Sequence, residues 1–239
     1  MTKSSSYPIT PRSRVKRFHE RGDHERAAVH AVLDASMLAH VAYVMDGQPY
    51  CTPTTHWRVG DWLYWHGSSA SRMLKQQKAG VPVCVTVTLL DGLVLARSGF
   101  NHSVQYRSAM CFGTARIIDG AAEKDAALRA VVDRFFPDRT AALRPILPQE
   151  AKATMVVGMQ IEEASAKIGA EGVCDEDDDY ALPIWAGVIP LTTVLGAAEP
   201  CPRLLPGVER PEGLAAYREG RRLDEVLLDM QREFEGKAG

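Results

Sequence analysis

The sequence has no closely spaced pair of cysteines and no long apolar run. Its five cysteines are odd in number and widely separated, and no C-x-x-C motif occurs. This pattern disfavours a structural zinc site and is typical of a reduced, cytoplasmic protein. No apolar stretch approaches the roughly 20 residues of a membrane span. The polar, basic segment 1–21 also lacks the apolar centre of a signal peptide.

The sequence also lacks an excess of charge of either sign. Its 28 lysines and arginines nearly balance its 30 aspartates and glutamates, and the formal net charge is −2. The sequence therefore shows no basic face or stripe of the kind that binds nucleic acid. Without a G-x-G-x-x-G, P-loop, H-E-x-x-H or G-x-S-x-G motif, a doubly wound nucleotide-binding sheet, a metalloprotease and a serine hydrolase are disfavoured. The acidic run 175–179 is expected to be a solvated loop, since its spacing is not that of an EF-hand.

The sequence does contain short segments of alternating apolar and polar residues, joined by tight turns. Asp46-Gly47 and Asp91-Gly92 are hairpin signals, and Gly113 is expected to mark a bulge or a close approach of two backbones. The predicted strands are 38–45, 48–58, 62–66, 81–90, 93–98, 107–118 and 154–161. The predicted helices are 24–34, 71–79, 123–136 and about 214–234.

These elements predict a mainly β fold with helices, in the α+β class. Six or seven antiparallel strands without β-α-β alternation favour a small barrel or a strongly bent sheet. We divide the chain into a flexible N-terminal arm (1–20), a barrel domain (21–195) and a C-terminal extension with a terminal helix (196–239). The last helix is expected to dock on the barrel or on a second subunit.

The segment 63–72, LYWHGSSASR, carries the clearest chemical signal. An aromatic strand runs into a hydroxyl-rich turn, and Arg72 follows at the start of a predicted helix. Unsatisfied N–H groups at a helix start, serine hydroxyls and a guanidinium together suit a phosphate group. The alternative is that Ser68 or Ser71 simply caps the helix.

Two of the seven histidines lie on neighbouring predicted strands. His56 and His66 lie on either side of the turn at Gly60, so their strands could bring them near one another. Two imidazoles without a third ligand make a poor metal site, so no metal is predicted. His66 directly precedes Gly67 and is instead a candidate to hydrogen-bond a bound phosphate compound or to donate a proton near neutral pH.

The chain resembles the flavin-nucleotide-binding relatives of pyridoxamine 5′-phosphate oxidase, and among them the 5-nitroimidazole resistance group. The resemblance extends over about 14–206, in order and with family-like spacing. It is carried by the segments 44–50, 53–55, 63–72, 82–98, 102–108 and 179–188. It implies a split β-barrel that pairs into a homodimer, with FMN in grooves at the subunit interface.

The resemblance also implies which residues meet FMN. Thr54, Thr55 and His56 are expected along the isoalloxazine ring. The ribityl chain and phosphate are expected to meet His66, Gly67, Ser68, Ser71 and Arg72. Thr86 and Thr88 are expected to face the flavin from the adjacent strand, and Tyr106, Arg107 and Trp185 to contribute across the dimer. Trp185 and Tyr106 can alternatively be a core anchor and an ordinary strand residue.

The function expected from this resemblance is reduction of small flat acceptors, such as nitroaromatics, by protein-bound FMN. The alternative is a non-catalytic module that binds flavin or haem. Pyridoxamine phosphate oxidation is disfavoured for two reasons. The region 185–190 lacks the Arg-x-His pair of true oxidases, and Met73 follows Arg72 where those enzymes carry a phosphate-binding lysine.

Overall fold

The computed structural model describes residues 4–71 and 80–238. The chain divides into two compact units. Unit 1 comprises residues 1–33, 86–111 and 162–192, and unit 2 comprises residues 34–85, 112–161 and 193–239. Within the described ranges, no helix has both the length and the apolar character needed to cross a membrane.

Antiparallel strands dominate the structure. Their order is β1-β8-β6-β7-β4-β3-β2-β5-β9, and an additional pairing of β6 with β5 closes the middle six strands into a ring. The strands are β1 (Gly22–Asp23), β2 (Leu38–Met45), β3 (Gln48–Val59), β4 (Trp62–Ser68), β5 (Val81–Leu95), β6 (Ser103–Ile118), β7 (Thr154–Gln160), β8 (Glu163–Gly169) and β9 (Gly187–Pro190). This confirms the predicted mainly β class with few helices.

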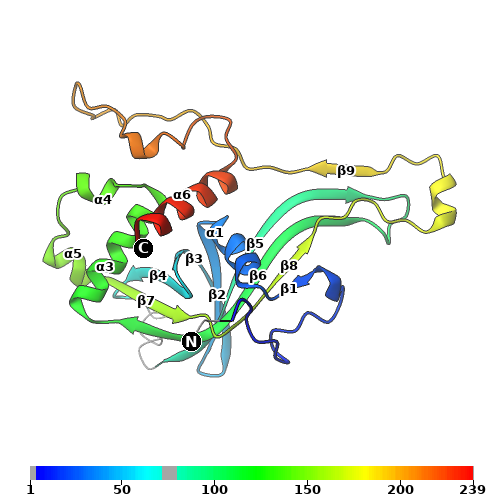
Figure 1. Cartoon of the computed structure of the whole chain (residues 1–239), viewed down its shortest axis with the longest axis horizontal. Coiled ribbons are helices and arrows are strands. Elements are labelled where there is room, and N and C mark those ends of the chain that lie inside the picture. Colours follow the sequence, from blue (N-terminus) through cyan, green and yellow to red (C-terminus); the bar gives the residue numbers. More distant parts are fainter. Residues whose placement is uncertain (1–3, 72–79, 239) are drawn as a thin grey trace. The chain divides into compact units, whose positions relative to one another are not determined.

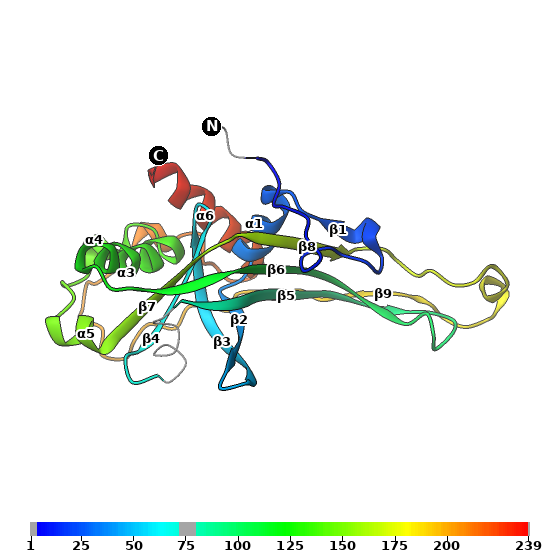
Figure 2. The same cartoon turned by 90° about the horizontal axis from the view of Figure 1, so that it is seen from below.

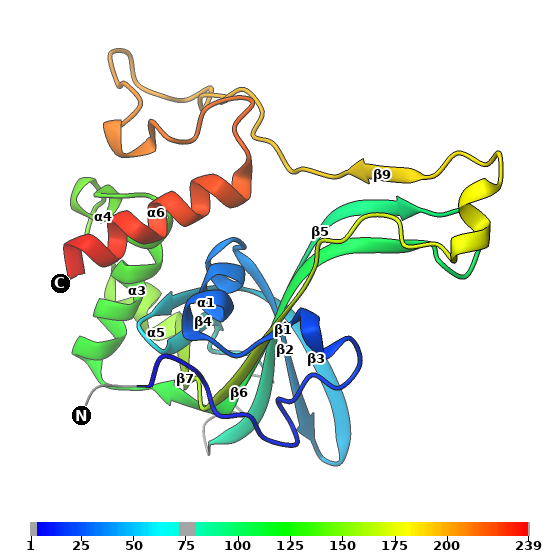
Figure 3. The same cartoon turned by 45° about the vertical axis from the view of Figure 1, so that its right-hand side comes forward.

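The helices connect and cover these strands. The α-helices are α1 (Arg26–Asp34), α3 (Ala121–Phe135), α4 (Arg139–Ala142), α5 (Pro148–Ala153) and α6 (Leu223–Ala238). Short 3-10 turns are η1 (His19–Arg21), η3 (Asp177–Ala181) and η4 (Glu212–Leu214). In unit 2, α3 and α6 lie side by side (Figure 3). The helix predicted over 71–79 falls almost entirely outside the described residues.

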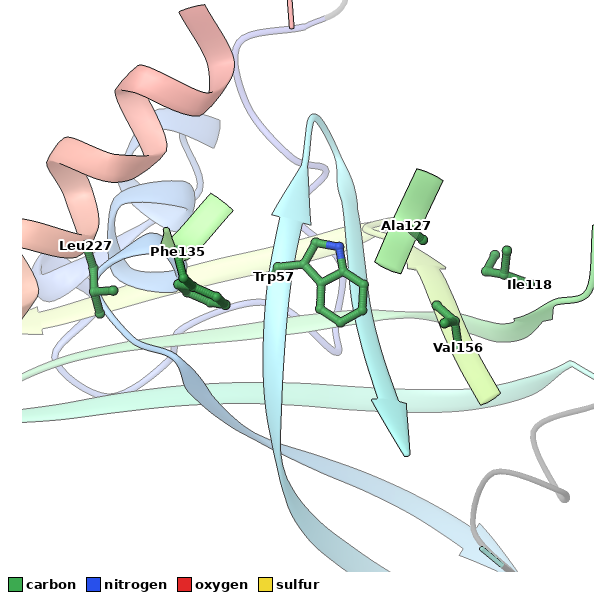
Figure 4. Close-up of a cluster of buried hydrophobic side chains, with 6 residues drawn as sticks. All are labelled: Trp57, Ile118, Ala127, Phe135, Val156 and Leu227. Carbon is green, nitrogen blue, oxygen red and sulfur yellow. The ribbon is translucent and has the colours of Figure 1, made fainter. Parts of the chain in front are cut away.

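One core of unit 2 gathers around Trp57, whose side chain is 1% exposed. It joins strands β3, β6 and β7 to helices α3 and α6 (Figure 4). Its members are Trp57, Ile118, Ala127, Phe135, Val156 and Leu227. Tyr64 on β4 stacks on Trp57 with ring centroids 5.7 Å apart. The aromatic strand of the sequence therefore packs largely into the core.

Residues 86–95 of β5 and residues 103–111 of β6 belong to unit 1. There β9 pairs with β5 through Leu93↔Ile189 and Val94↔Val188, and β1 pairs with β8. Figures 1 and 2 show β9 running beside β5, and β8 beside β6. The sequence did not predict β8 or β9.

The hairpin predicted at Asp91-Gly92 is wrong. Strand β5 continues through both residues to Leu95, and β6 begins only at Ser103. Asp91 receives two hydrogen bonds from Arg107 on β6, at 2.7 and 2.8 Å. A Cβ on Gly92 would lie 2.8 Å from the Gln105 side chain. Gly92 thus serves close packing between β5 and β6, whereas Asp46 and Gly47 both adopt the positive φ of a true hairpin turn.

The N-terminal segment is packed rather than a flexible arm. Tyr7 is 2% exposed, and its hydroxyl lies 2.8 Å from His30 Nε2. The Thr10 hydroxyl donates to Glu163. These contacts tie the segment to α1 and β8 within unit 1.

The C-terminal helix is also part of a core. It begins at Leu223, nine residues after the predicted start at 214, and Leu227 is fully buried. Glu235 accepts a hydrogen bond from Arg58 on β3 at 2.7 Å. Within the chain, α6 therefore packs against β3 as part of unit 2.

The acidic run is only partly a solvated loop. Asp175 is buried and pairs with Arg97, Nη1 to Oδ2 at 2.9 Å, and it also accepts from the Arg97 backbone N–H at 3.0 Å. Burial acts to raise the pKa of Asp175, but these hydrogen bonds outweigh it and hold the pKa below its ordinary value. The neighbouring Asp177, Asp178 and Asp179 lie in η3.

Candidate functional site

The hydroxyl-rich corner follows β4, as predicted, but its backbone amides are already engaged. Ser69 N–H donates to Ala153 O at 2.8 Å, and Ser71 N–H donates to Ser68 O at 2.8 Å. Ala70 N–H donates to Ser68 Oγ at 3.2 Å. These three amides are therefore not available to an added anion. Arg72 lies outside the described residues.

His66 lies on β4 two residues before this corner. It pairs with Val156 of β7, and Gly67 pairs with Met155. The imidazole is exposed but rests against Trp57, with ring centroids 5.8 Å apart. Partial burial by these neighbours lowers the pKa of His66 below its ordinary value of 6.5. This favours the neutral ring, which accepts one hydrogen bond and donates another.

The three predicted ring-contacting residues on β3 separate into two kinds. Thr54 and Thr55 are half-buried, and the Thr54 hydroxyl donates to Thr55 O at 3.3 Å. His56 is 2% exposed and pairs on the strand with Trp65, which is also buried. The structure therefore argues against a role for His56 along an exposed flavin ring. In the β3–β4 pairing His56 lies opposite Trp65, so the next residue along β4, His66, points to the other face of the sheet.

The other predicted residues lie in unit 1. Thr86 is half-buried and Thr88 is exposed, two residues apart on β5. Arg107 is bound through Nε and Nη2 to both carboxylate oxygens of Asp91. This ion pair links β5 to β6, and the sequence did not predict it because Asp91 was assigned to a turn.

Tyr106 and Trp185 each lie against a glycine. A Cβ on Gly169 would be 2.8 Å from the Tyr106 ring, and one on Gly187 would be 3.0 Å from the Trp185 ring. Tyr106 is half-buried, whereas Trp185 is 66% exposed. Trp185 is therefore not a core anchor of this chain.

Unit 1 contains a pocket that sequence reasoning missed. Its volume is about 310 Å³, and its lining includes Arg17, Phe18, Arg21, Phe100 and His102. Arg17 comes from the segment predicted to be a flexible arm and Arg21 directly follows it, so no sequence pattern pointed to a site there. Among the described residues, no group of three or more His, Cys, Asp or Glu side chains is placed to hold a metal ion.

Comparison with known proteins gives consistent findings. The family model described as pyridoxamine 5′-phosphate oxidase matches residues 25–168. The flavocytochrome Anf3 from Azotobacter vinelandii is 44% identical, with a TM-score of 0.83 over 88% of this chain and 98% of its own. The FAD and heme binding protein from Mycobacterium smegmatis is 40% identical, with a TM-score of 0.79 over 85% of this chain and 98% of its own. No curated protein sequence matches the chain.

A more distant structure shares the fold alone. The protein from Bacteroides thetaiotaomicron that is described as a 5-nitroimidazole antibiotic resistance protein is 20% identical. It covers 62% of this chain and 86% of its own, with a TM-score of 0.51. These similarities confirm the split-barrel fold predicted from the sequence. With more than half of its length matched by the family model and with relatives above 30% identity, the chain belongs to the pyridoxamine 5′-phosphate oxidase family.

Proposed function

We propose that the protein binds a flavin nucleotide and a haem and acts as a redox protein. The observation that carries this proposal is the similarity, over 88% and 85% of the chain, to two proteins whose names specify these groups. A flavin supplies electron transfer in one- or two-electron steps, while the protein binds it, orients it and excludes water.

The described residues fit the flavin mononucleotide moiety that FMN and FAD share. Half-buried hydroxyls on β3, at Thr54 and Thr55, offer hydrogen bonds to the polar edge of a ring. The hydroxyls of Ser68 and Ser71 offer donors that a phosphate needs. Arg72, outside the described residues, is proposed to add its guanidinium to them. The neutral His66 can bond the ribityl chain. The family resemblance predicts that the bound flavin is FMN. The name of the mycobacterial relative instead specifies FAD.

A titration of flavin fluorescence tests this proposal. Apoprotein is titrated separately with FMN and FAD, and Arg72→Ala is compared with Arg232→Ala, an exposed arginine on α6. Arg72→Ala should weaken binding by about 2–3 kcal/mol, as expected for a charge-assisted hydrogen bond, while Arg232→Ala should leave it unchanged. Wild-type protein that binds neither flavin would overturn the proposal.

The proposed activity is reduction of small flat acceptors, nitroaromatics among them, by the bound flavin. His66 is the candidate side chain to hydrogen-bond or protonate such an acceptor. The competing function is a module that holds flavin and haem without efficient turnover. Steady-state rates with a reduced nicotinamide and a panel of acceptors separate the two, because rates no faster than those of free flavin favour the module.

A second copy of the chain completes the proposed flavin site. Unit 1 exposes apolar side chains of the kind that oligomer interfaces cover. They are Leu90, Leu93, Tyr180, Leu182, Ile184, Trp185 and Ile189. The prominent exposure of Trp185 supports the prediction that it contributes to the flavin groove of a partner subunit.

A further inference from the structure

The pocket of unit 1 carries more positive charge than its own acidic residue neutralises. Arg21 and Arg17 place their guanidinium carbons 4.3 and 5.2 Å from the centroid of the Phe18 ring. Lys167 Nζ lies 5.7 Å from the same centroid. Among the described residues that line the pocket, Glu171 is the one carboxylate, and it pairs with Arg21, Nε to Oε1 at 3.0 Å. The positive charge that remains favours an anionic ligand.

Arg17 is the lining cation most available to such a ligand. Its exposed guanidinium contacts the Phe18 ring, and within residues 4–71 and 80–238 it has neither an ion pair nor a hydrogen bond. Its backbone is held in place, because its carbonyl oxygen accepts a hydrogen bond from Lys167 Nζ at 2.9 Å. The following turn is closed by a bond from Arg21 N–H to Phe18 O at 3.1 Å. The loop therefore presents an unpaired guanidinium, the group that best pairs with a carboxylate or a phosphate.

The imidazole of His102 adds a hydrogen-bond acceptor to the lining. Its Nδ1 lies 2.8 Å from the carbonyl oxygen of Ser98. Because a carbonyl oxygen only accepts, Nδ1 carries the proton of the neutral ring and Nε2 presents its lone pair. A lone pair at this position favours a ligand that carries an O–H or N–H group as well as its negative charge.

The apolar side of the pocket is an aromatic ring left in water. Phe100 is 91% exposed, and Val104 beside it in the lining is also exposed. A flat ring stacked on Phe100 would remove apolar surface of both partners from water. The pocket volume of about 310 Å³ lies at the lower end of small-molecule sites, about 300–1,000 Å³. This size suits a ligand with a single ring.

We infer that this pocket binds a small aromatic oxyanion, a single-ring carboxylate or phosphate with a hydroxyl group on the ring. Arg17 pairs with the anionic group, Phe100 stacks on the ring, and His102 Nε2 accepts a hydrogen bond from the hydroxyl. Among the described lining residues, none is one of those proposed above to meet the flavin. The inference therefore does not depend on flavin binding.

Isothermal titration calorimetry of the full-length protein tests the inference with defined probes. The two anions are 4-hydroxybenzoate and 4-hydroxyphenyl phosphate, which separate a carboxylate site from a phosphate site. The uncharged 4-hydroxybenzamide keeps the ring and the hydroxyl, and it should bind at least about 10-fold more weakly, since a hydrogen bond to a charged group is lost. Benzoate keeps the charge but lacks the hydroxyl, and it should also bind more weakly than 4-hydroxybenzoate.

Two matched pairs of variants locate the bound probe. Arg17→Gln should weaken binding of the better anion by at least about 10-fold, while Arg14→Gln, an exposed arginine of the same segment outside the lining, should not. Phe100→Ala should weaken binding, while Ile9→Ala, an exposed apolar residue of unit 1 outside the lining, should not. Circular dichroism spectra equal to that of the wild type show that the variants are folded.

The variant His102→Phe tests the hydroxyl contact separately. It should remove the preference for 4-hydroxybenzoate over benzoate, a change that a loss of packing alone would not produce. The inference is overturned if neither anion binds the wild-type protein, or if binding is unchanged in both Arg17→Gln and Phe100→Ala. The flavin titration of the same variants should match that of the wild type, so either result leaves the proposed function standing.

Discussion

Arg58 shows how strongly a single side chain can tie distant segments together. Buried on β3, it donates to Asp34 through Nε at 3.0 Å and Nη2 at 2.6 Å, and to Gly60 O at 2.8 Å. Arg58→Met would leave the buried carboxylate of Asp34 without this cation. We expect the free energy of unfolding to fall by about 3–5 kcal/mol, measured by urea denaturation.

The matched control for this change is Arg129→Met. Arg129 pairs with Asp125 on the surface of α3, four residues away and half exposed. Such pairs contribute about 0.3–0.5 kcal/mol, so the control should unfold almost as the wild type does. If the two variants lose equal stability, the buried ion pair does not have the role given to it here.

His66 should titrate at a lower pH than a free histidine. Its folded-state pKa lies below 6.5 because of partial burial, so the unfolded chain binds the proton first as the pH falls. The stability contribution of the neutral ring is complete above the unfolded pKa and is lost as the pH falls through the folded pKa. NMR titration of the His66 ring measures this directly, and His66→Asn should remove the corresponding pH dependence of stability. An unshifted His66 resonance would contradict the prediction.

At the scale of elements, α6 should be indispensable to unit 2. Leu227 is fully buried in the core that contains Trp57 and Phe135. Leu227→Ala should cost about 2–5 kcal/mol of unfolding free energy through lost contacts and the cavity left behind. Arg232→Ala on the exposed side of the same helix is the control and should cost less than about 0.5 kcal/mol. Thermal unfolding of both variants would show whether α6 is only an appendage.

Gly113 should tolerate no side chain. A Cβ there would lie 2.3 Å from the Gln160 carbonyl oxygen and 2.8 Å from Met159 Cγ. This confirms the close backbone approach expected from the sequence. Gly113→Ala should therefore destabilise the protein by about 1–3 kcal/mol, whereas Gly99→Ala, with open space around its Cβ, should not. Equal denaturation midpoints for the two variants would argue against a tight contact between β6 and β7.

Sequence reasoning succeeded where local chemistry decided the structure. Asp46 and Gly47 both have positive φ angles, which aspartate and glycine adopt more readily than other residues. This hairpin was therefore predictable from the sequence. The same dipeptide type at Asp91-Gly92 failed because Arg107, sixteen residues away, fixes Asp91 within a strand. Strands β8 and β9 likewise depend on partners distant in sequence. At the site, the hydroxyls of Ser68 and Ser71 were predictable, whereas the engagement of the neighbouring amides was not.

At the scale of the whole molecule, the proposed dimer should depend on the exposed face of unit 1. Trp185→Arg places a charge where an apolar interface is expected and should shift sedimentation toward the monomer. Leu205→Arg, a change at a leucine 72% exposed in unit 2, should not. An interface of the obligate class buries more than about 2,000 Å², and added flavin should stabilise the dimer by mass action. A monomeric wild-type protein that binds flavin with full affinity would contradict this prediction.

The interleaving of the two units affects how the protein can be made. The chain passes between them five times, and unit 1 is complete only at residue 192, unit 2 only at residue 239. A ribosome releases the N-terminal end first, so the early strands emerge before the partners that cover them. Nascent chains of this protein must therefore keep unpaired strand edges from aggregating until the last segments of both units have been synthesised.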